Sequence, residues 1–463
     1  MHDPSLINSL YIVAFALFIV GLMQMRGPRT AVRGNWIAAA GMAVAVVATL
    51  LIDGMGNWLL IALGIGIGTV ISIPSAYKVK MTAMPQMVAL FNGLGGGAIA
   101  LISWAQFRDT AGFVDYPLHA VISSLFAALV GSISFWGSLI AYGKLQELLS
   151  GKPITLGRLQ QPINVFMIAC AVAACVVVIA GGTSEWWMIA LLIASAVVGL
   201  MVVLPIGGAD MPVVISLLNA LTGLSAAAKG LALDNTALIV AGMIVGASGS
   251  ILTSLMAQAM NRSIPAIVAG GFGGGAAAPP SAGAEERPVR STSASDAAIQ
   301  LAYAGKVVVV PGYGMAVAQA QHAVKEMASL LEKQGIEVSY AIHPVAGRMP
   351  GHMNVLLAEA DVPYEALKEM DESNSEFSQT DVALVIGAND VINPAADTDP
   401  ASPIYGMPIL KVNHCRSIIV IKRSMSPGFA GIDNELYYDP KTSMLFQDAK
   451  TATTDIVEEL KHL

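Results

Sequence analysis

Nine long apolar segments occupy residues 1–262 and constrain the fold more than any other feature of the sequence. A helix needs about 20 mostly apolar residues to cross the roughly 30 Å hydrocarbon core of a bilayer, where its backbone groups must be paired internally. The predicted spans are Leu6–Met25, Trp36–Ile52, Trp58–Ala76, Ala83–Phe107, Leu118–Tyr142, Pro162–Gly181, Trp186–Leu204, Met211–Gly230 and Thr236–Met260. We therefore expect a multi-pass α-helical membrane domain of about nine helices, in contact with lipid.

The overall composition agrees with a membrane protein and narrows its other functions. Of the 463 residues, 55% are hydrophobic and 12% are charged, and this charged share is about half that of an average soluble domain. The net charge of -7, without a long run of Lys or Arg, gives no reason to expect nucleic acid as a partner. Cys170 and Cys175 lie in an apolar run far from Cys415, so we expect neither a disulfide framework nor a metal site.

The distribution of basic residues predicts the orientation. Lys and Arg resist translocation and therefore mark the cytoplasmic side. The loops after the first, third, fifth and ninth segments carry Arg26, Arg29, Arg33, Lys78, Lys80, Lys144, Lys152, Arg158 and Arg262, whereas the opposite loops carry Arg108 and Lys229. We expect a protein of the inner (plasma) membrane whose N-terminus lies outside and whose C-terminal domain is cytoplasmic.

The composition changes after Arg262. Residues 263–298 are rich in Gly, Ala, Pro and Ser and predict a flexible linker. Residues 299–463 read as alternating strands and helices at 307–311, 315–334, 337–343, 353–359, 363–370, 382–387, 417–422 and 451–463. Apolar strands separated by helical patterns indicate an α/β, Rossmann-like, doubly wound parallel sheet.

A glycine motif marks a nucleotide site in this second domain. The apolar strand 307–311 is followed by Gly312, Gly314 and Val317 in the pattern GxGxxV, and a helical stretch comes next. The first glycine permits a tight turn, and the second lets backbone N–H groups approach a pyrophosphate. Its position between a strand and a helix favours nucleotide binding over an ordinary glycine turn.

Two further features concern the choice between NAD and NADP. A site selective for NAD would carry an acidic residue near the end of the second strand, but the strand 337–343 finishes at His343 without one. Lys422 and Arg423 follow the strand 417–422, at the edge where ligands of parallel sheets bind. They are candidates for contacts with a 2′-phosphate; the alternative is a solvated basic pair.

Several long strings make the sequence specific. They are VPGYGMAVAQAQ at 310–321, HPVAGRMPGHMNVLLAEA at 343–360, VIGANDVINPAA at 385–396, IKRSM at 421–425, GGADMPVVISLLNALTGLSAAAKG at 207–230 and GASGSILTSLMAQAMNRS at 246–263. Together these strings closely resemble the beta subunit of proton-translocating NAD(P) transhydrogenase, and the resemblance covers nearly the whole chain.

The resemblance implies a function and a set of site residues. NADP(H) would bind to the C-terminal domain, and NAD(H) to a partner alpha subunit that carries further membrane helices, within a dimer of alpha-beta units. Hydride transfer between NADH and NADP⁺ would then be coupled to proton movement. The implied cofactor contacts are Gly312, Tyr313, Gly314, Met315, Ala316, Val317, His343, Val345, Ala346, Gly347, Arg348, Gly387, Ala388, Asn389, Asp390, Lys422, Arg423, Ser424, Gly428, Phe429 and Ala430.

Asp390 also matches an acidic position near the nicotinamide, which implies a catalytic role in coupling protonation to the bound redox state. Without the family match it would be interpreted as an ordinary cap after a strand. Phe429 stands where tyrosine is common in the family, so it keeps a ring contact and loses a hydroxyl hydrogen bond.

Polar residues inside the spans are the candidates for a proton path, because such groups are costly in lipid. The resemblance favours Asn92, Asp210 and Asn219. Some family members carry a histidine at the position of Asn92, and asparagine cannot titrate. In another arrangement of the family the protonatable histidine comes from the partner subunit's helices, and the resemblance implies that arrangement here. The alternative function is a transporter or channel gated by a cytosolic nucleotide-sensing domain, which would bind nucleotide without turning it over.

Overall fold

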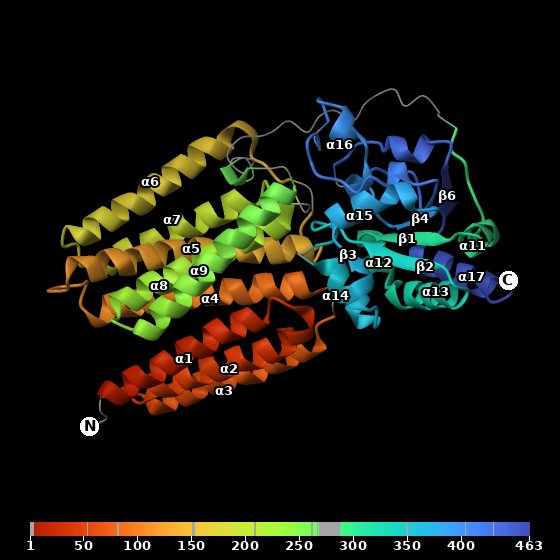
Figure 1. Ribbon diagram of the computed structural model, residues 1–463. Coiled ribbons are helices and arrows are strands. Elements are labelled where there is room, and N and C mark those ends of the chain that lie inside the picture. Colours follow the sequence, from red (N-terminus) through yellow and green to blue (C-terminus); the bar gives the residue numbers. More distant parts are fainter. Residues whose placement is uncertain are drawn as a thin grey trace. The chain divides into compact units, whose positions relative to one another are not determined.

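The computed structural model describes residues 4–52, 54–80, 83–150, 153–207, 210–260, 263–265, 267, 288–348, 351–402, 404–428 and 430–463. The chain divides into two compact units (Figure 1). The first, here called the membrane unit, contains residues 1–206 and 214–252. The second, the sheet unit, contains residues 207–213 and most of the chain from 253 onwards, so that the division passes through the ends of two helices.

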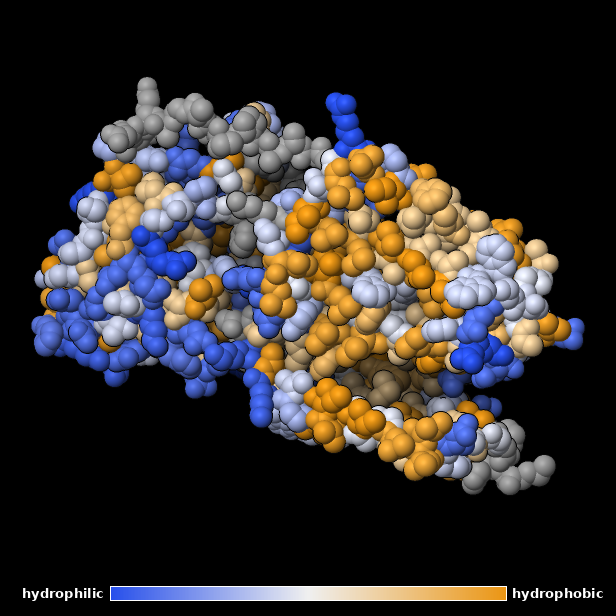
Figure 2. All heavy atoms as spheres, turned by 180° about the vertical axis from the view of Figure 1, so that it is seen from behind, coloured by the Kyte–Doolittle hydropathy of each residue, from blue (hydrophilic) through white to orange (hydrophobic). Residues whose placement is uncertain are grey.

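Nine helices of the described part of the chain are long and apolar enough to cross a membrane. They are α1 (Pro4–Gln24), α2 (Pro28–Leu50), α3 (Trp58–Lys78), α4 (Met84–Asp109), α5 (Leu118–Leu145), α6 (Gln160–Ile179), α7 (Glu185–Val203), α8 (Met211–Ala232) and α9 (Thr236–Ala259). Figure 2 shows hydrophobic side chains spread over the outside of these helices. This arrangement, in which apolar residues face outwards, is that of a membrane protein and confirms the predicted class.

Glycine and alanine allow the helices of the membrane unit to approach closely. A Cβ atom added at Gly96 of α4 would lie 2.8 Å from the carbonyl oxygen of Gly131 in α5, and one added at Gly131 would lie 2.7 Å from that of Gly96. Contact between backbones stabilises helix pairs in lipid, because the hydrophobic effect contributes little there. In contrast, a Cβ at Gly64, Gly66 or Gly68 of α3 would have no atom within 4 Å.

The sheet unit contains six parallel strands in the order β3-β2-β1-β4-β5-β6. The strands are β1 (Lys306–Pro311), β2 (Glu337–Ala341), β3 (Leu367–Lys368), β4 (Val382–Ile386), β5 (Ser417–Lys422) and β6 (Thr442–Phe446). β1 and β4 are neighbours. From β1 the sheet continues to β2 and β3 on one side, and from β4 it continues to β5 and β6 on the other. The predicted doubly wound parallel sheet is confirmed, and its switch point lies between β1 and β4.

Helices cover both faces of this sheet. They are α11 (Ala294–Ala302), α12 (Tyr313–Ala318), α13 (Gln321–Lys333), α14 (His352–Glu359), α15 (Met370–Glu376), α16 (Ala395–Thr398) and α17 (Ala449–Leu460). The apolar faces of α11 and α13 pack against α17. Strands β1, β4 and β5 are buried along most of their length, because helices and loops shield both of their faces.

Several local expectations differ from the structure. The helix expected at 315–334 is two helices, because Gln319 adopts a left-handed backbone with φ of 52° and ends α12. The segment 363–370 forms a 3-10 turn and the two-residue strand β3. Strand β6 was not anticipated. The predicted linker 263–298 falls largely on residues outside the described ranges, and α11 begins at Ala294, before its expected end.

Candidate functional site

The glycine turn after β1 fits closely against the turn after β4. Gly312 and Gly314 donate their N–H groups to the carbonyl oxygens of Ile386 and Gly387, both at 2.9 Å. A Cβ atom at Gly314 would lie 2.7 Å from Cα of Gly387, and one at Gly312 would overlap the backbone of Gly387 and Ala388. Both glycines are therefore needed for contact between two loops, a reason that the motif alone does not reveal.

The side chains of this turn divide into two groups. Those of Met315 and Ala316 are fully buried, so they anchor the turn to the core of the sheet unit. Tyr313 is half-buried, and Val317 is 52% exposed. Of the side chains predicted here, Tyr313 and Val317 are the ones that a ligand can reach.

The loop after β2 is held by two buried histidines. His343 Nδ1 accepts the N–H of Val345 at 3.2 Å, so its Nε2 donates to the carbonyl of Pro408 at 2.8 Å. His352 Nδ1 accepts the N–H of Arg348 at 3.0 Å. Burial lowers the pKa of His343, and burial together with Arg348 lowers the pKa of His352 to about 4. Both rings are neutral at pH 7 and shape the loop by hydrogen bonding.

This histidine-supported loop presents a cation beside the glycine turn. The guanidinium carbon of Arg348 lies 4.7 Å from the centre of the Tyr313 ring, a cation–π distance. Two predicted residues from separate loops thus come together. The side chain of Ala346 is buried, whereas Val345, Gly347 and Arg348 are half-buried. Arg348 is accordingly the charged group of this loop that can meet an anion.

Asp390 lies where the loop after β4 meets the loop after β5. Its Oδ2 accepts the N–H of Ala430 at 3.0 Å, and a Cβ atom at Gly428 would overlap its carboxylate. Asn389 receives hydrogen bonds from the Tyr437 hydroxyl at 2.9 Å and from Asn434 at 3.2 Å. Asp390 therefore contacts both Gly428 and Ala430 after β5. Phe429 lies outside the described residues.

The end of β5 supplies three polar side chains. Lys422 is half-buried, donates to the carbonyl of Ser426 at 2.6 Å, and lies with its ammonium 4.7 Å from the centre of the Tyr437 ring. Burial lowers the pKa of Lys422, although Asp390 and Asp433 act in the opposite direction. Arg423 and Ser424 are exposed. Because all the strands are parallel, this basic end lies at the same sheet edge as the glycine turn.

In the membrane unit, Asn92 belongs to a buried polar network. Its amide donates to the hydroxyls of Ser138 at 3.0 Å and Ser134 at 3.3 Å, both on α5. Ser134 in turn hydrogen-bonds Thr222 of α8 at 2.5 Å. Asn219 lies on α8, three residues before Thr222, and is half-buried. Asp210 directly precedes α8 but belongs to the sheet unit.

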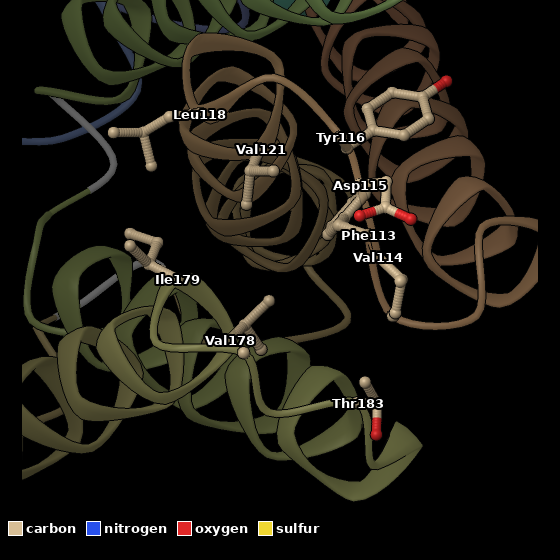
Figure 3. Close-up of a pocket in the computed structure, with 11 residues that line it drawn as sticks. Phe113, Val114, Asp115, Tyr116, Leu118, Val121, Val178, Ile179 and Thr183 are labelled. Atoms are coloured by element: carbon tan, nitrogen blue, oxygen red, sulfur yellow. The ribbon is translucent and has the colours of Figure 1, made fainter.

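A cavity of about 280 Å³ lies in the membrane unit, beside the start of α5 and the end of α6 (Figure 3). The α4–α5 turn and the α6–α7 turn form its walls, including Phe113, Asp115, Val121, Val178 and Thr183. Most of this lining is apolar, and it contains none of the residues predicted to bind a cofactor. The cavity is thus separate from the predicted cofactor contacts, which lie in loops at the sheet edge.

Comparison with known proteins decides the family. The model of the NAD(P) transhydrogenase beta subunit family matches residues 7–459. This chain is a member of that family. NAD(P) transhydrogenase subunit beta of Rhodospirillum rubrum and that of a strain of the same species are each 49% identical over 462 residues, which cover 98% of this chain and 99% of each relative. The transhydrogenase beta family therefore extends over both units, and the alternative of a nucleotide-gated channel is not favoured.

Sequence reasoning missed three supporting residues of this transhydrogenase beta chain. His352 and Tyr437 hold the loops that carry Arg348 and Asn389. Neither lies within a strand or helix expected from the sequence, since the nearest expected elements are 353–359, 417–422 and 451–463. Lys229, expected in an outer loop, is instead completely buried in α8. The signal that could have identified it was an ionisable residue within an otherwise apolar span.

Proposed function

We propose that the sheet unit binds NADP(H) across the switch point between β1 and β4. The observation that carries this proposal is the charge pattern at the sheet edge: β2 leads to neutral His343, whereas β5 leads to Lys422 and Arg423. An acidic residue after β2 would repel a 2′-phosphate, and the two cations would attract it. Ser424, exposed beside them, adds a hydroxyl donor.

The other loops fit the remainder of a dinucleotide. Tyr313 and Val317 line the glycine turn, and Arg348 stands over Tyr313 as the cation for a pyrophosphate. Asp390 joins the β4 and β5 loops near the position proposed for the nicotinamide. Its carboxylate accepts a hydrogen bond from the N–H of Ala430. A change in the protonation of Asp390 would weaken this bond and thereby change the affinity for the cofactor.

We further propose that the chain acts with an alpha subunit that binds NAD(H). The nicotinamides supply the hydride chemistry, and the protein needs to orient them and exclude water. The two couples have nearly equal potentials, so the drive towards NADPH comes from proton movement. A membrane potential of roughly 200 mV is worth about 4.6 kcal/mol per charge, which shifts an equilibrium about a thousandfold.

The membrane unit would conduct that proton in the inner membrane, with the N-terminus outside and the sheet unit cytoplasmic. Asn92 with Ser134, Ser138 and Thr222 supports this proposal, because it is a connected set of polar groups inside apolar helices. Asn219, which is half-buried on α8, and Asp210, which directly precedes α8, are the further polar residues proposed for this path. We propose assembly as a dimer of alpha-beta units, in which the partner's helices supply the histidine absent at Asn92.

Binding of NADP⁺ and NAD⁺ to the full-length purified chain tests the cofactor proposal. Calorimetric titration should show at least about tenfold tighter binding of NADP⁺. Arg423→Ala should reduce that preference about tenfold or more, since a hydrogen bond to a charged group is worth about 1.5–3 kcal/mol. Lys450→Ala, which removes an exposed cation from α17, is the matched control. Equal affinities in the unaltered chain would contradict the proposal.

Reconstituted vesicles test the coupling. The chain is assembled with its alpha subunit so that the sheet unit faces the external solution. Reduction of an NAD⁺ analogue by external NADPH should acidify the lumen, and a protonophore should abolish the pH difference while hydride transfer continues. Hydride transfer without any proton gradient would contradict proton coupling.

A further inference from the structure

Lys229 is a charged residue buried within the membrane unit. Its exposed fraction is 0%. The ammonium donates to the amide oxygen of Gln106 on α4 and, at 2.9 Å, to the hydroxyl of Ser124 on α5. Three helices therefore meet around one lysine, at the end of the unit where α4 and α8 finish and α5 begins.

The two partners of Lys229 are neutral. Ser124 also donates to the Gln106 amide oxygen at 2.9 Å, and the Gln106 amide nitrogen faces the carbonyl of Ala232 at 3.4 Å. Among the described residues, no carboxylate lies within ion-pair distance of Lys229. An amine held only by dipoles and removed from water changes its protonation readily, whereas a carboxylate partner would hold it charged.

The charged groups of the surrounding elements point elsewhere. Arg108 and Asp109 at the end of α4 are exposed, and Arg108 approaches Glu185 of α7 at 3.5 Å. His119 on α5 and Asp234 in the α8–α9 turn are exposed as well. Helix α9, which contacts α8 at Gly230, has no ionisable side chain between Thr236 and Ala259. Among the described residues of these elements, the buried lysines are thus Lys229, near the start of α5, and Lys144, at the opposite end of α5.

Polar side chains also lie between this cluster and the Asn92 network, and the hydroxyls of Ser103 and Ser225 each donate to a carbonyl of their own helix. On α8, Thr222, Ser225 and Lys229 recur at helical spacing on one side. The seven residues from Thr222 to Lys229 correspond to about 10 Å along the axis. Ser103 of α4 and Ser225 are both fully buried between the two levels. The polar row follows the α4–α5–α8 contact rather than lying scattered over the unit.

The cavity of Figure 3 lies close to the Lys229 end of this row. Val121 lines that cavity, and Ser124 follows it by three residues on the same side of α5. One helical turn, about 5 Å, therefore separates the two levels along the axis. A proton that enters at the α4–α5 turn meets the Lys229 cluster before the Asn92 network.

We propose that Lys229, held by Gln106 and Ser124, is a proton-exchanging group on the route through the membrane unit. The neutral amine gains a proton and becomes the ammonium, and the ammonium returns the proton to water or to the polar row; no electron moves. This inference rests on the proposed proton coupling. It assigns a titratable group to this chain itself, in addition to the histidine expected on the partner.

Proton transport by the assembled enzyme in vesicles, measured from pH 5 to pH 10, tests the inference. Lys229→Met should reduce transport about a hundredfold, the scale of a lost proton-transfer group. Single-turnover hydride transfer from bound NADPH to an NAD⁺ analogue should stay unchanged. Lys229→Arg should remain inactive, because a guanidinium keeps its proton. Full transport in either variant would overturn the inference, since a filler or a fixed charge would then suffice.

Two further variants keep the inference testable. Lys229→His retains a titratable group with a lower ordinary pKa, so the transport optimum should move to lower pH; an unshifted optimum would overturn the role of Lys229. Lys144→Met is the matched control, because the buried Lys144 of α5 donates to the carbonyls of Leu204 and Ile206 and caps the end of α7. Its pH profile should be that of the unaltered enzyme. Absence of hydride transfer in the unaltered enzyme would instead refute the proposed function.

Discussion

The membrane unit and the sheet unit use their polar groups in opposite ways. In the membrane unit, side chains such as Asn92 and Ser134 hydrogen-bond each other between helices, far from any chain end. In the sheet unit, Lys422 ends β5, Asp390 and Arg348 follow strands at the same edge, and the strands themselves are mostly apolar. Polar groups thus connect helices in one unit and lie at the proposed cofactor site in the other. The comparison teaches that the two units should respond differently to the same perturbation.

Acid should produce the largest difference. The pKa of His352 is lowered to about 4 by burial and by Arg348, below the usual 6.5. Between pH 6.5 and 4 the unfolded chain binds a proton that the folded chain does not. The stability of the sheet unit is therefore complete above pH 6.5 and falls by up to about 3 kcal/mol as the pH approaches 4.

This acid effect can be followed in the full chain. All 6 tryptophans lie at or before Trp187, so their fluorescence reports on the membrane unit alone. Hydrogen exchange of β1, β4 and β5 reports on the sheet unit. Exchange should accelerate on acidification before the fluorescence changes, and His352→Gln should weaken the effect. Simultaneous loss of both signals would show that the two units do not differ in their response to acid.

Added volume at a close glycine contact should have the next largest effect, and in both units. Gly314→Val places methyl groups against Gly387, and Gly96→Val places them against Gly131. Overpacking of this kind costs about 2 kcal/mol. Gly314→Val should abolish NADP⁺ binding measured by calorimetry, whereas Gly96→Val should lower the thermal midpoint of the membrane unit and leave NADP⁺ binding intact. If Gly96→Val lowered NADP⁺ affinity without lowering the thermal midpoint of the membrane unit, the expected independence of the two units would be contradicted.

Loss of the Tyr313 ring should have a smaller effect. Tyr313→Leu removes the aromatic face over which Arg348 lies at 4.7 Å, an interaction worth about 0.5–1 kcal/mol at a partly exposed site. NADP⁺ affinity should fall between about twofold and fivefold. Tyr303→Leu, at an exposed tyrosine outside the site, should leave the affinity unchanged. If Tyr303→Leu lowered NADP⁺ affinity as much as Tyr313→Leu, the contact between Arg348 and Tyr313 would not explain the loss of affinity.

The smallest change is expected on α3. Gly66→Ala adds a methyl group where no atom lies within 4 Å, and alanine is favoured over glycine in a helix interior by roughly 0.5 kcal/mol. The thermal midpoint should therefore stay equal or rise slightly. A clear decrease would show that an atom from outside this chain occupies the space beside Gly66 in the assembled enzyme.

The comparison also explains what the sequence could and could not predict. The spans and the buried strands follow from long apolar runs, whose character local composition determines. Strand β6 contains Thr442 and Ser443, which are polar yet buried, so its pattern did not stand out. The break at Gln319 is a single left-handed residue within an otherwise helical pattern. Such local backbone choices depend on tertiary packing, which composition does not record.

The positions of the candidate site residues at the sheet edge were predictable to a similar degree. The glycine turn and the basic end of β5 follow motifs with a known position relative to strands. The partners of His343 and Asp390 could not be inferred, because Pro408 and Ala430 are distant in sequence and meet them only after folding. Lys229 shows the opposite case: its residue type was conspicuous, but its depth depended on how α4 and α5 pack around α8.

The contact of the two turns at the sheet edge has a mechanical consequence. Gly312 and Gly314 donate to the carbonyls of Ile386 and Gly387, with no room between the loops for a single additional carbon. The β1 loop therefore cannot be displaced without carrying the loop of Asp390 with it. A displacement of one loop should therefore reach the other as a rigid-body movement.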